Sequence, residues 1–183
     1  MFIVGGLADS DSDKKQFRKD VISFDTVQKS WLPPVKKVLA SSKKYKMVTV
    51  ESLSCSDKFC FALFRGRTEK SEEIHYIDEI SLDCLRFPGT RPSTRFLTNV
   101  PTWFKSRFTF CSDQSSVLYL CGGSGFARFS LLSQGWEKLQ KPIGDLGEEE
   151  PWLVAVPENV FLLTGKPRSG DSAVTNYIQV GWK

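Results

Sequence analysis

Short apolar runs that end in glycine recur four times along the chain. Each run is typical of a buried strand that a glycine stops. The runs span residues 2–6, 61–66, 117–123 and 160–165. Recurrence of one pattern in this way indicates a repeat architecture, in which each unit buries its apolar faces against its neighbours.

A second strand, which carries an aromatic residue, follows each glycine after a polar loop. In three copies a tryptophan comes soon afterwards, whereas Leu85 and Phe87 stand at that place in the second copy. Another short strand and a polar turn precede three of the runs, with strands at 47–53, 107–111 and 152–156. The unit is therefore predicted to have four strands: a first strand, the glycine-ended strand, the aromatic strand and the tryptophan-bearing strand.

Four antiparallel strands in each repeat fit the blade of a β-propeller, whose sheets bury both faces against their neighbours. We expect an all-β chain with a single domain over 1–183. Its blades are predicted at approximately 1–45, 46–105, 106–145 and 146–183. A β-sandwich binding domain remains the alternative fold, because glycine-ended strands and scattered tryptophans also occur there.

The pattern resembles the kelch repeat, in which an apolar run ends in a double glycine and is followed by a Tyr or Phe strand and then a Trp. In the two best copies the aromatic and the tryptophan are seven residues apart, Phe24 to Trp31 and Phe129 to Trp136. The residues that carry the resemblance are Gly5, Gly6, Phe24, Trp31, Gly66, Tyr76, Gly122, Gly123, Phe129, Trp136, Gly165, Tyr177 and Trp182. The resemblance implies a kelch-type β-propeller, in which the glycines allow a close backbone turn and the aromatics pack between blades.

Four repeats are few for such a propeller, and the two ends do not supply each other's missing strands. The chain begins within its first glycine-ended strand and stops directly after Trp182. We therefore expect an incomplete propeller, which needs further sequence or another chain to close.

Composition changes this picture little. With 25 basic and 21 acidic residues the net charge is +4, too modest to indicate a nucleic-acid partner. The five cysteines are odd in number, and all but Cys55 lie in or beside apolar strands, as buried thiols do. A reducing compartment, cytoplasmic or nuclear, is expected, and no stretch is apolar enough for a membrane helix.

The sequence offers few residues for catalysis. His75 is the only histidine and lies in a strand pattern, which favours a packed structural role. Cys55 and Cys60 have no second close pair for zinc, and the glycines at 122–125 lack the lysine of a phosphate loop. We expect no enzymatic activity, no cofactor and no metal.

Binding is expected on the loops after the glycines and between the blades. The connection from Pro88 to Ser106 is predicted to be a long loop, and 7–19 a shorter one. The candidate partner-binding residues are Arg67, Arg91, Arg95, Trp103, Lys166 and Arg168. The kelch resemblance implies a protein-interaction module that recruits an acidic or phosphorylated peptide segment to a ubiquitin-ligase complex, or that binds actin. The alternative is nucleic-acid or acidic-ligand binding through the basic loop at 36–46.

Overall fold

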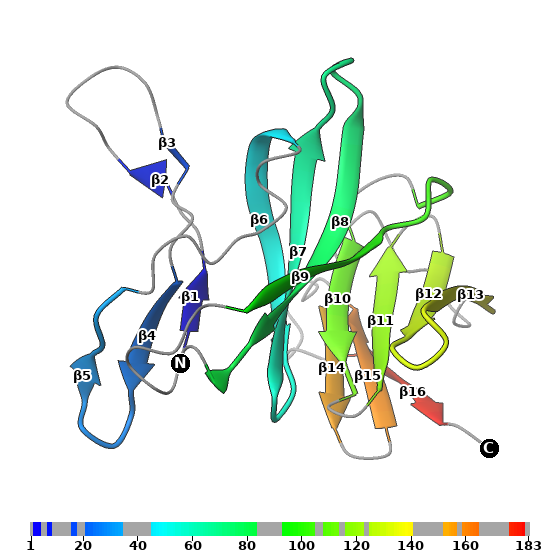
Figure 1. The fold of residues 1–183 in the computed structure, drawn as a ribbon. Helices are drawn as coiled ribbons and strands as arrows, with labels where there is room; N and C mark the ends of the chain where they lie inside the picture. The colour runs from blue at the N-terminus through cyan, green and yellow to red at the C-terminus, as the bar shows by residue number, and fades with distance from the viewer. Residues whose placement is uncertain are drawn as a thin grey trace, which may run out of the picture. The chain divides into compact units, whose positions relative to one another are not determined.

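The computed structural model of the chain is built of antiparallel strands (Figure 1). It describes residues 2–4, 7–8, 16–17, 21–34, 45–83, 93–104, 108–113, 116–122, 125–140, 152–156, 159–164 and 176–181. Its strands form four open sheets and a two-stranded hairpin. The all-β fold class is thus confirmed. None of the described residues belongs to a helix long and apolar enough to cross a bilayer.

The chain divides into two compact units, each described by itself. The first unit comprises Met1–Leu53 and Asp57–Val100, and the second comprises Ser54–Ser56 and Pro101–Lys183.

Sheet 1 belongs to the first unit. It contains β1 (Phe2–Val4), β4 (Val21–Asp25) and β5 (Ser30–Trp31) in that spatial order. The stretch between β1 and β4, predicted as a loop, includes a small antiparallel hairpin of β2 (Leu7–Ala8) and β3 (Gln16–Phe17). Strands of two residues leave no alternating pattern in a sequence, which explains why the pattern did not indicate them.

Sheet 2 completes the first unit with a meander of four strands. These are β6 (Lys46–Cys55), β7 (Phe59–Arg67), β8 (Glu73–Ser81) and β9 (Thr94–Asn99). The five residues from Cys60 to Phe64 in β7 are all 0% exposed. Consecutive residues of a strand point to opposite faces, so β7 is covered on both faces. This burial is the reason for its unbroken apolar run.

The fourth strand of sheet 2 corrects the prediction for 88–106. That connection is not all loop, because it contains β9. Leu85 and Phe87 lie outside the described residues, and Phe96 in β9 has its ring 6.4 Å from that of Tyr76. Phe96 is opposite Asp78, and Asn99 is opposite Tyr76, so sheet 2 lacks the directly opposed aromatic pair of sheets 1 and 3. The prediction was wrong because the chain between β8 and β9 is much longer than the turns that precede β5 and β13.

The core of the first unit centres on Tyr76 in β8. Its ring stacks on Phe64 at 5.1 Å between centroids and lies 4.8 Å from the ring of Tyr45. Val21 of β4, which is 0% exposed, belongs to the same apolar cluster. Sheet 1 therefore contributes to the core that sheet 2 builds.

Sheet 3, in the second unit, repeats the four-stranded meander. Its strands are β10 (Phe108–Ser112), β11 (Val117–Gly122), β12 (Gly125–Ser130) and β13 (Gly135–Leu139). Phe129 lies opposite Trp136, with 5.1 Å between ring centroids. In sheet 1, Phe24 lies opposite Trp31 at the same 5.1 Å. The seven-residue spacing seen in the sequence therefore corresponds to one cross-strand aromatic pair, used twice.

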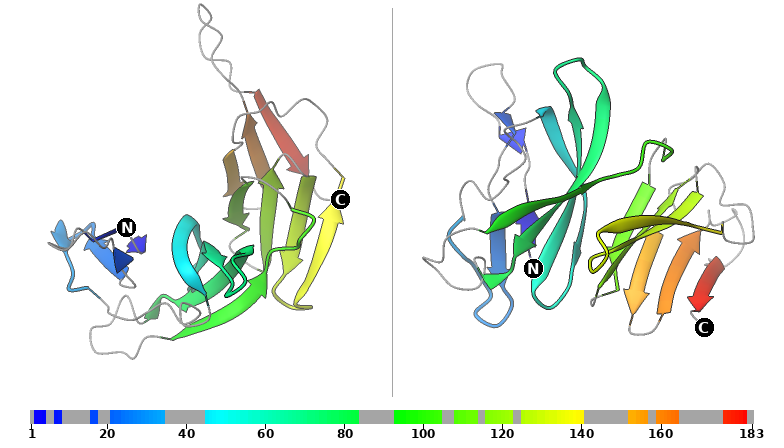
Figure 2. Two further views of the ribbon diagram at one scale, coloured as in Figure 1. Left: turned by 90° about the horizontal axis from the view of Figure 1, so that it is seen from above. Right: turned by 45° about the vertical axis from the view of Figure 1, so that its right-hand side comes forward.

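Sheet 4 consists of β14 (Trp152–Val156), β15 (Asn159–Thr164) and β16 (Asn176–Gly181). Figures 1 and 2 show β14 beside β10 of sheet 3. Leu153 of β14 is buried in a cluster with Cys111, Tyr119, Cys121 and Phe126. Its backbone N–H donates a hydrogen bond of 3.3 Å to Oγ1 of Thr109. The two sheets of the second unit thus share an apolar core, and this hydrogen bond between them lies beside it.

The four predicted runs contribute strands to four different sheets: β1, β7, β11 and β15. The prediction that a glycine ends each strand is wrong for Gly66, because β7 continues through it to Arg67. Each sheet also falls within one of the four predicted repeats. Gly5, Gly6, Gly123, Gly165 and Trp182 lie outside the described residues, and Tyr177 is described only as part of β16. The arrangement of the sheets as a single propeller domain, and its incompleteness, stay predictions.

Candidate functional site

Three of the six predicted partner-binding residues fall on described parts of the chain. Arg67 is exposed at the end of β7, and Arg95 is exposed on β9. Trp103 comes after β9 in the chain and belongs to the second unit. Arg91, Lys166 and Arg168 lie outside the described residues. Arg67 and Arg95 belong to the first unit and Trp103 to the second, so each is described within its own unit.

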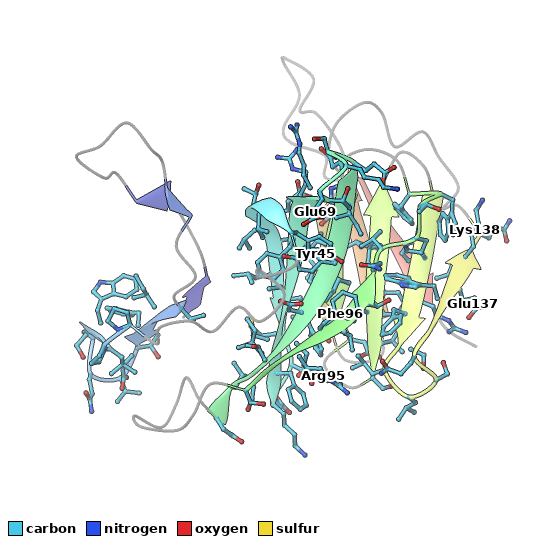
Figure 3. The ribbon with its side chains drawn as sticks, turned by 45° about the horizontal axis from the view of Figure 1, so that its top comes forward. Tyr45, Glu69, Arg95, Phe96, Glu137 and Lys138 are labelled. Atoms are coloured by element: carbon cyan, nitrogen blue, oxygen red, sulfur yellow. The ribbon has the colours of Figure 1, made fainter. Side chains whose placement is uncertain are left out.

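Arg95 and Trp103 both make contacts within their units. Nη2 of Arg95 lies 3.0 Å from Oε2 of Glu79, its cross-strand neighbour. The ammonium group of Lys138 lies 5.4 Å from the centroid of Trp103, a cation–π distance. Figure 3 shows Arg95 on β9 and Lys138 on β13. A partner would have to compete with these contacts.

A cluster of charged side chains spans three strands of sheet 2. Glu51 in β6 has one carboxylate oxygen 3.0 Å from Nε of Arg65 and the other 3.3 Å from Nε2 of His75. Glu73 lies 3.9 Å from the same histidine nitrogen. Arg65 and His75 are opposite each other on β7 and β8. His75 therefore lies in a strand, as predicted, and these polar contacts connect β6 to β7 and β8.

A groove of about 410 Å³ opens on the outer part of sheet 3. Its volume falls in the range of small-ligand sites. All of its lining residues come from β11, β12, β13 and the turn between the last two. They are Val117, Arg128, Ser130, Ser133, Gly135, Trp136 and Glu137.

The turn between β12 and β13 forms one end of this groove. The N–H of Gln134 donates to the carbonyl of Ser130 at 2.9 Å, and the N–H of Ser133 donates to Oγ of Ser130 at 3.2 Å. Gln134 has φ of 55°, the left-handed conformation that lets the chain reverse. This closed turn contains Ser130 and Ser133, which both line the groove. Leu132, at the tip of the turn, is 86% exposed.

Three polar side chains stand in a row across sheet 3, because the strand register sets Tyr119, Arg128 and Glu137 opposite one another. Nε of Arg128 lies 2.6 Å from Oε2 of Glu137. Burial raises the pKa of Tyr119 to about 12; the negative charge of Asp113 adds to this rise, and Arg128 opposes it. Tyr119 therefore stays neutral, and the charges at the groove are those of Arg128 and Glu137.

Two buried thiols lie on β10 and β11 of the same sheet. Cys111 and Cys121 are buried, and Cys60 is buried in sheet 2, while Cys55 is exposed. None of these four cysteines is in a disulfide, and Cys84 lies outside the described residues. Burial, with the nearby Asp113 and Cys121, raises the pKa of Cys111 to about 12. Its thiol is therefore protonated and unreactive at neutral pH.

No group of three or more His, Cys, Asp or Glu side chains in the described ranges could hold a metal ion. The most complete site on these residues is the groove of sheet 3. Sequence reasoning missed Arg128 and Glu137, which line it. The available signal was the alternation in β12 and β13, which places Arg128 and Glu137 on one face once the strands are paired.

In comparisons with protein-family models, with curated proteins and with solved structures, the chain matches none.

Proposed function

We propose that this chain is a kelch-type propeller module that binds a partner protein, with the groove of sheet 3 as part of the binding surface. The fold part of the proposal is supported by the recurring strand order and by the aromatic pairs Phe24–Trp31 and Phe129–Trp136. In a propeller each such sheet is one blade, and blade surfaces are common sites of partner binding.

The observation that carries the binding function is the composition of the groove. Trp and Arg side chains dominate the energetics of protein interfaces, and Arg128 and Trp136 are both among the residues that line this groove, together with two serines. The exposed Leu132 extends the same surface with an apolar tip. Such a mixture suits a short segment of a partner that has both polar and apolar side chains.

The kelch resemblance suggests which cellular role the proposed binding would serve. It favours a role as a substrate-recognition part of a ubiquitin-ligase adaptor or as an actin-associated scaffold, in the cytoplasm or the nucleus. The basic loop at 36–46, which suggested the nucleic-acid alternative, lies largely outside the described residues. No described contact favours that alternative.

Site-specific photo-cross-linking tests the proposal. A benzoylphenylalanine at position 132 stands beside the groove, and one at position 27 serves as a matched control. Val27 is 88% exposed in the corresponding turn of sheet 1, and Leu132 is 86% exposed. In extracts of the native cell type, we expect one recurrent protein to be cross-linked from position 132 and not from position 27. Excess unmodified chain should abolish the product. Equal, non-competable labelling from both positions would count against a binding module.

A further inference from the structure

We infer that a second copy of this chain covers sheet 1, by packing the outer face of its sheet 4 on the face that carries Phe24 and Trp31. The contact joins the first sheet of one copy to the last sheet of the other. It uses surfaces other than the groove of sheet 3, and it adds self-association to the proposed binding of a partner.

Sheets 1 and 3 contain the same aromatic pair with unequal cover. Phe24 is opposite Trp31 in sheet 1, and Phe129 is opposite Trp136 in sheet 3. We call the face that carries this pair, and the face of Tyr76 in sheet 2, the aromatic face of each sheet. Phe129 and Tyr76 are each 1% exposed, whereas Trp31 is 53% exposed. Among the described parts of these three sheets, the aromatic face of sheet 1 is therefore the least covered.

The first unit shows which kind of surface covers an aromatic face. Val21 lies three residues before Phe24 in β4, so the two side chains point to opposite faces of sheet 1. We call the face opposite to the aromatic one the reverse face. Val21, on the reverse face of sheet 1, packs in the cluster that contains Phe64 and Tyr76 of sheet 2. The aromatic face of sheet 2 is thus covered by the reverse face of another sheet.

Sheet 4 has a free face of the corresponding kind. Phe126 lies three residues before Phe129 in β12, so it is on the reverse face of sheet 3, where it clusters with Leu153 of sheet 4. Sheet 4 therefore turns its Leu153 face towards the sheet that precedes it in the chain. Its other face, with Val154, corresponds to the reverse faces of sheets 1 and 3. Val154 is 40% exposed.

The composition of sheet 4 favours cover on this second face as well. Its strands β14, β15 and β16 read WLVAV, NVFLLT and NYIQVG, without a charged residue. Strands that are apolar throughout are typical of sheets covered on both faces. Contact between the two faces removes Trp31 and Val154 from water without burying a charged residue of sheet 4, and burial of such apolar surface drives association. A second copy fits because each copy carries both faces, which makes the contact heterologous.

Sedimentation velocity of the full chain over a series of concentrations tests this inference. We expect reversible self-association. Trp31→Glu and Val154→Glu should each weaken it at least about tenfold, because either change places an unpaired charge in the contact. Val27→Glu is the matched control, since it adds the same charge to sheet 1 at a side chain that is 88% exposed in the turn before β5. It should leave the association unchanged.

A mixture of the two variants makes the test specific to these faces. The Trp31→Glu chain keeps an intact sheet 4, and the Val154→Glu chain keeps an intact aromatic face on sheet 1. The mixture should therefore associate more strongly than either variant alone, which also shows that the retained faces are folded. In a second measurement, benzoylphenylalanine at position 31 should cross-link to 152–156. With isotope-labelled and unlabelled chains mixed, the product should join one of each.

Four results would overturn the inference: a chain that stays monomeric at every concentration, association that Val154→Glu leaves unchanged, a mixture that associates no better than its components, or cross-links from position 31 confined to one chain. The two proposals fail separately. A monomeric chain that still captures a partner from position 132 contradicts the self-association alone. A chain that associates but captures no partner from position 132 contradicts the proposed function alone.

Discussion

At Gly66 in β7, an added Cβ would lie 3.1 Å from Cβ of Tyr45 and 3.4 Å from Cε1 of Tyr76. The backbone at Gly66 does not have positive φ, which Gly125 alone has among the described glycines. The glycine is therefore required by the close approach of Tyr45, and not by a left-handed turn. This physical role differs from the tight turn that the kelch resemblance implies for the glycine.

Gly66→Ala should destabilise the first unit by about 1–3 kcal/mol, because Cβ of Tyr45 is too near its own backbone to move away. Gly135→Ala is the matched control, since the nearest atom to its added Cβ, Oγ of Ser133, is at 3.6 Å. That substitution should change stability by less than about 0.5 kcal/mol. Urea unfolding of both variants measures the difference. Equal effects would mean that the contact with Tyr45 is not the cause.

At the scale of elements, the turns before β5 and β13 are built alike. Lys29 has φ of 53° and Gln134 has φ of 55°, each directly before the residue that starts the next strand. A side chain closes each turn: Oδ1 of Asp25 accepts hydrogen bonds from the N–H groups of Val27 and Gln28, and Oγ of Ser130 accepts one from Ser133. Asp and Ser suit this position because their short side chains reach the backbone of the turn.

The left-handed backbone conformation of Lys29 leads to a specific prediction. Lys29→Gly should be more stable than Lys29→Val by about 1–2 kcal/mol, because a β-branched residue is strained at positive φ whereas glycine is not. At Thr26 of the same turn, which does not have positive φ, valine should be at least as stable as glycine. Thermal or urea unfolding of the four variants measures the contrast. The same order of glycine and valine at both positions would refute this account of the turn.

Elements also show the limits of sequence patterns. The strands β7 and β11 were located correctly because a strand covered on both faces is apolar throughout, and this signal needs no knowledge of its neighbours. β9 was missed because its burial pattern at an edge is mixed, with only Leu97 buried among its six residues. A strand of this kind is recognised through its partner β8 and not by its own composition.

At the scale of whole sheets, the second unit is held together where β14 meets β10 and β11. Leu153 is 8% exposed within the shared cluster, while its neighbour Val154 is 40% exposed. Adjacent residues of a strand point to opposite faces, so only one of the two supports the packing of sheet 4 on sheet 3.

Leu153→Ala should destabilise the second unit by about 2–4 kcal/mol, because it leaves a cavity between two sheets. Val154→Ala should cost less than about 1 kcal/mol, as expected of a side chain that stays partly in water. Unfolding curves give both values, and amide exchange in β14 should accelerate in the Leu153 variant alone. Similar losses in the two variants would show that sheet 4 is not anchored through Leu153.

The sequence by itself determined the all-β class, the strands in the four apolar runs, the seven-residue spacing from Phe24 to Trp31 and from Phe129 to Trp136, and the buried thiols Cys60, Cys111 and Cys121. These features are local, because burial and turn formation depend on residues close together in the chain. Only the tertiary structure decided that Phe96 stands beside Tyr76, that Gly66 makes room for Tyr45, and that Arg128 and Glu137 form a groove with Trp136. Each of these depends on strand register, and a shift of one residue would turn every side chain to the other face.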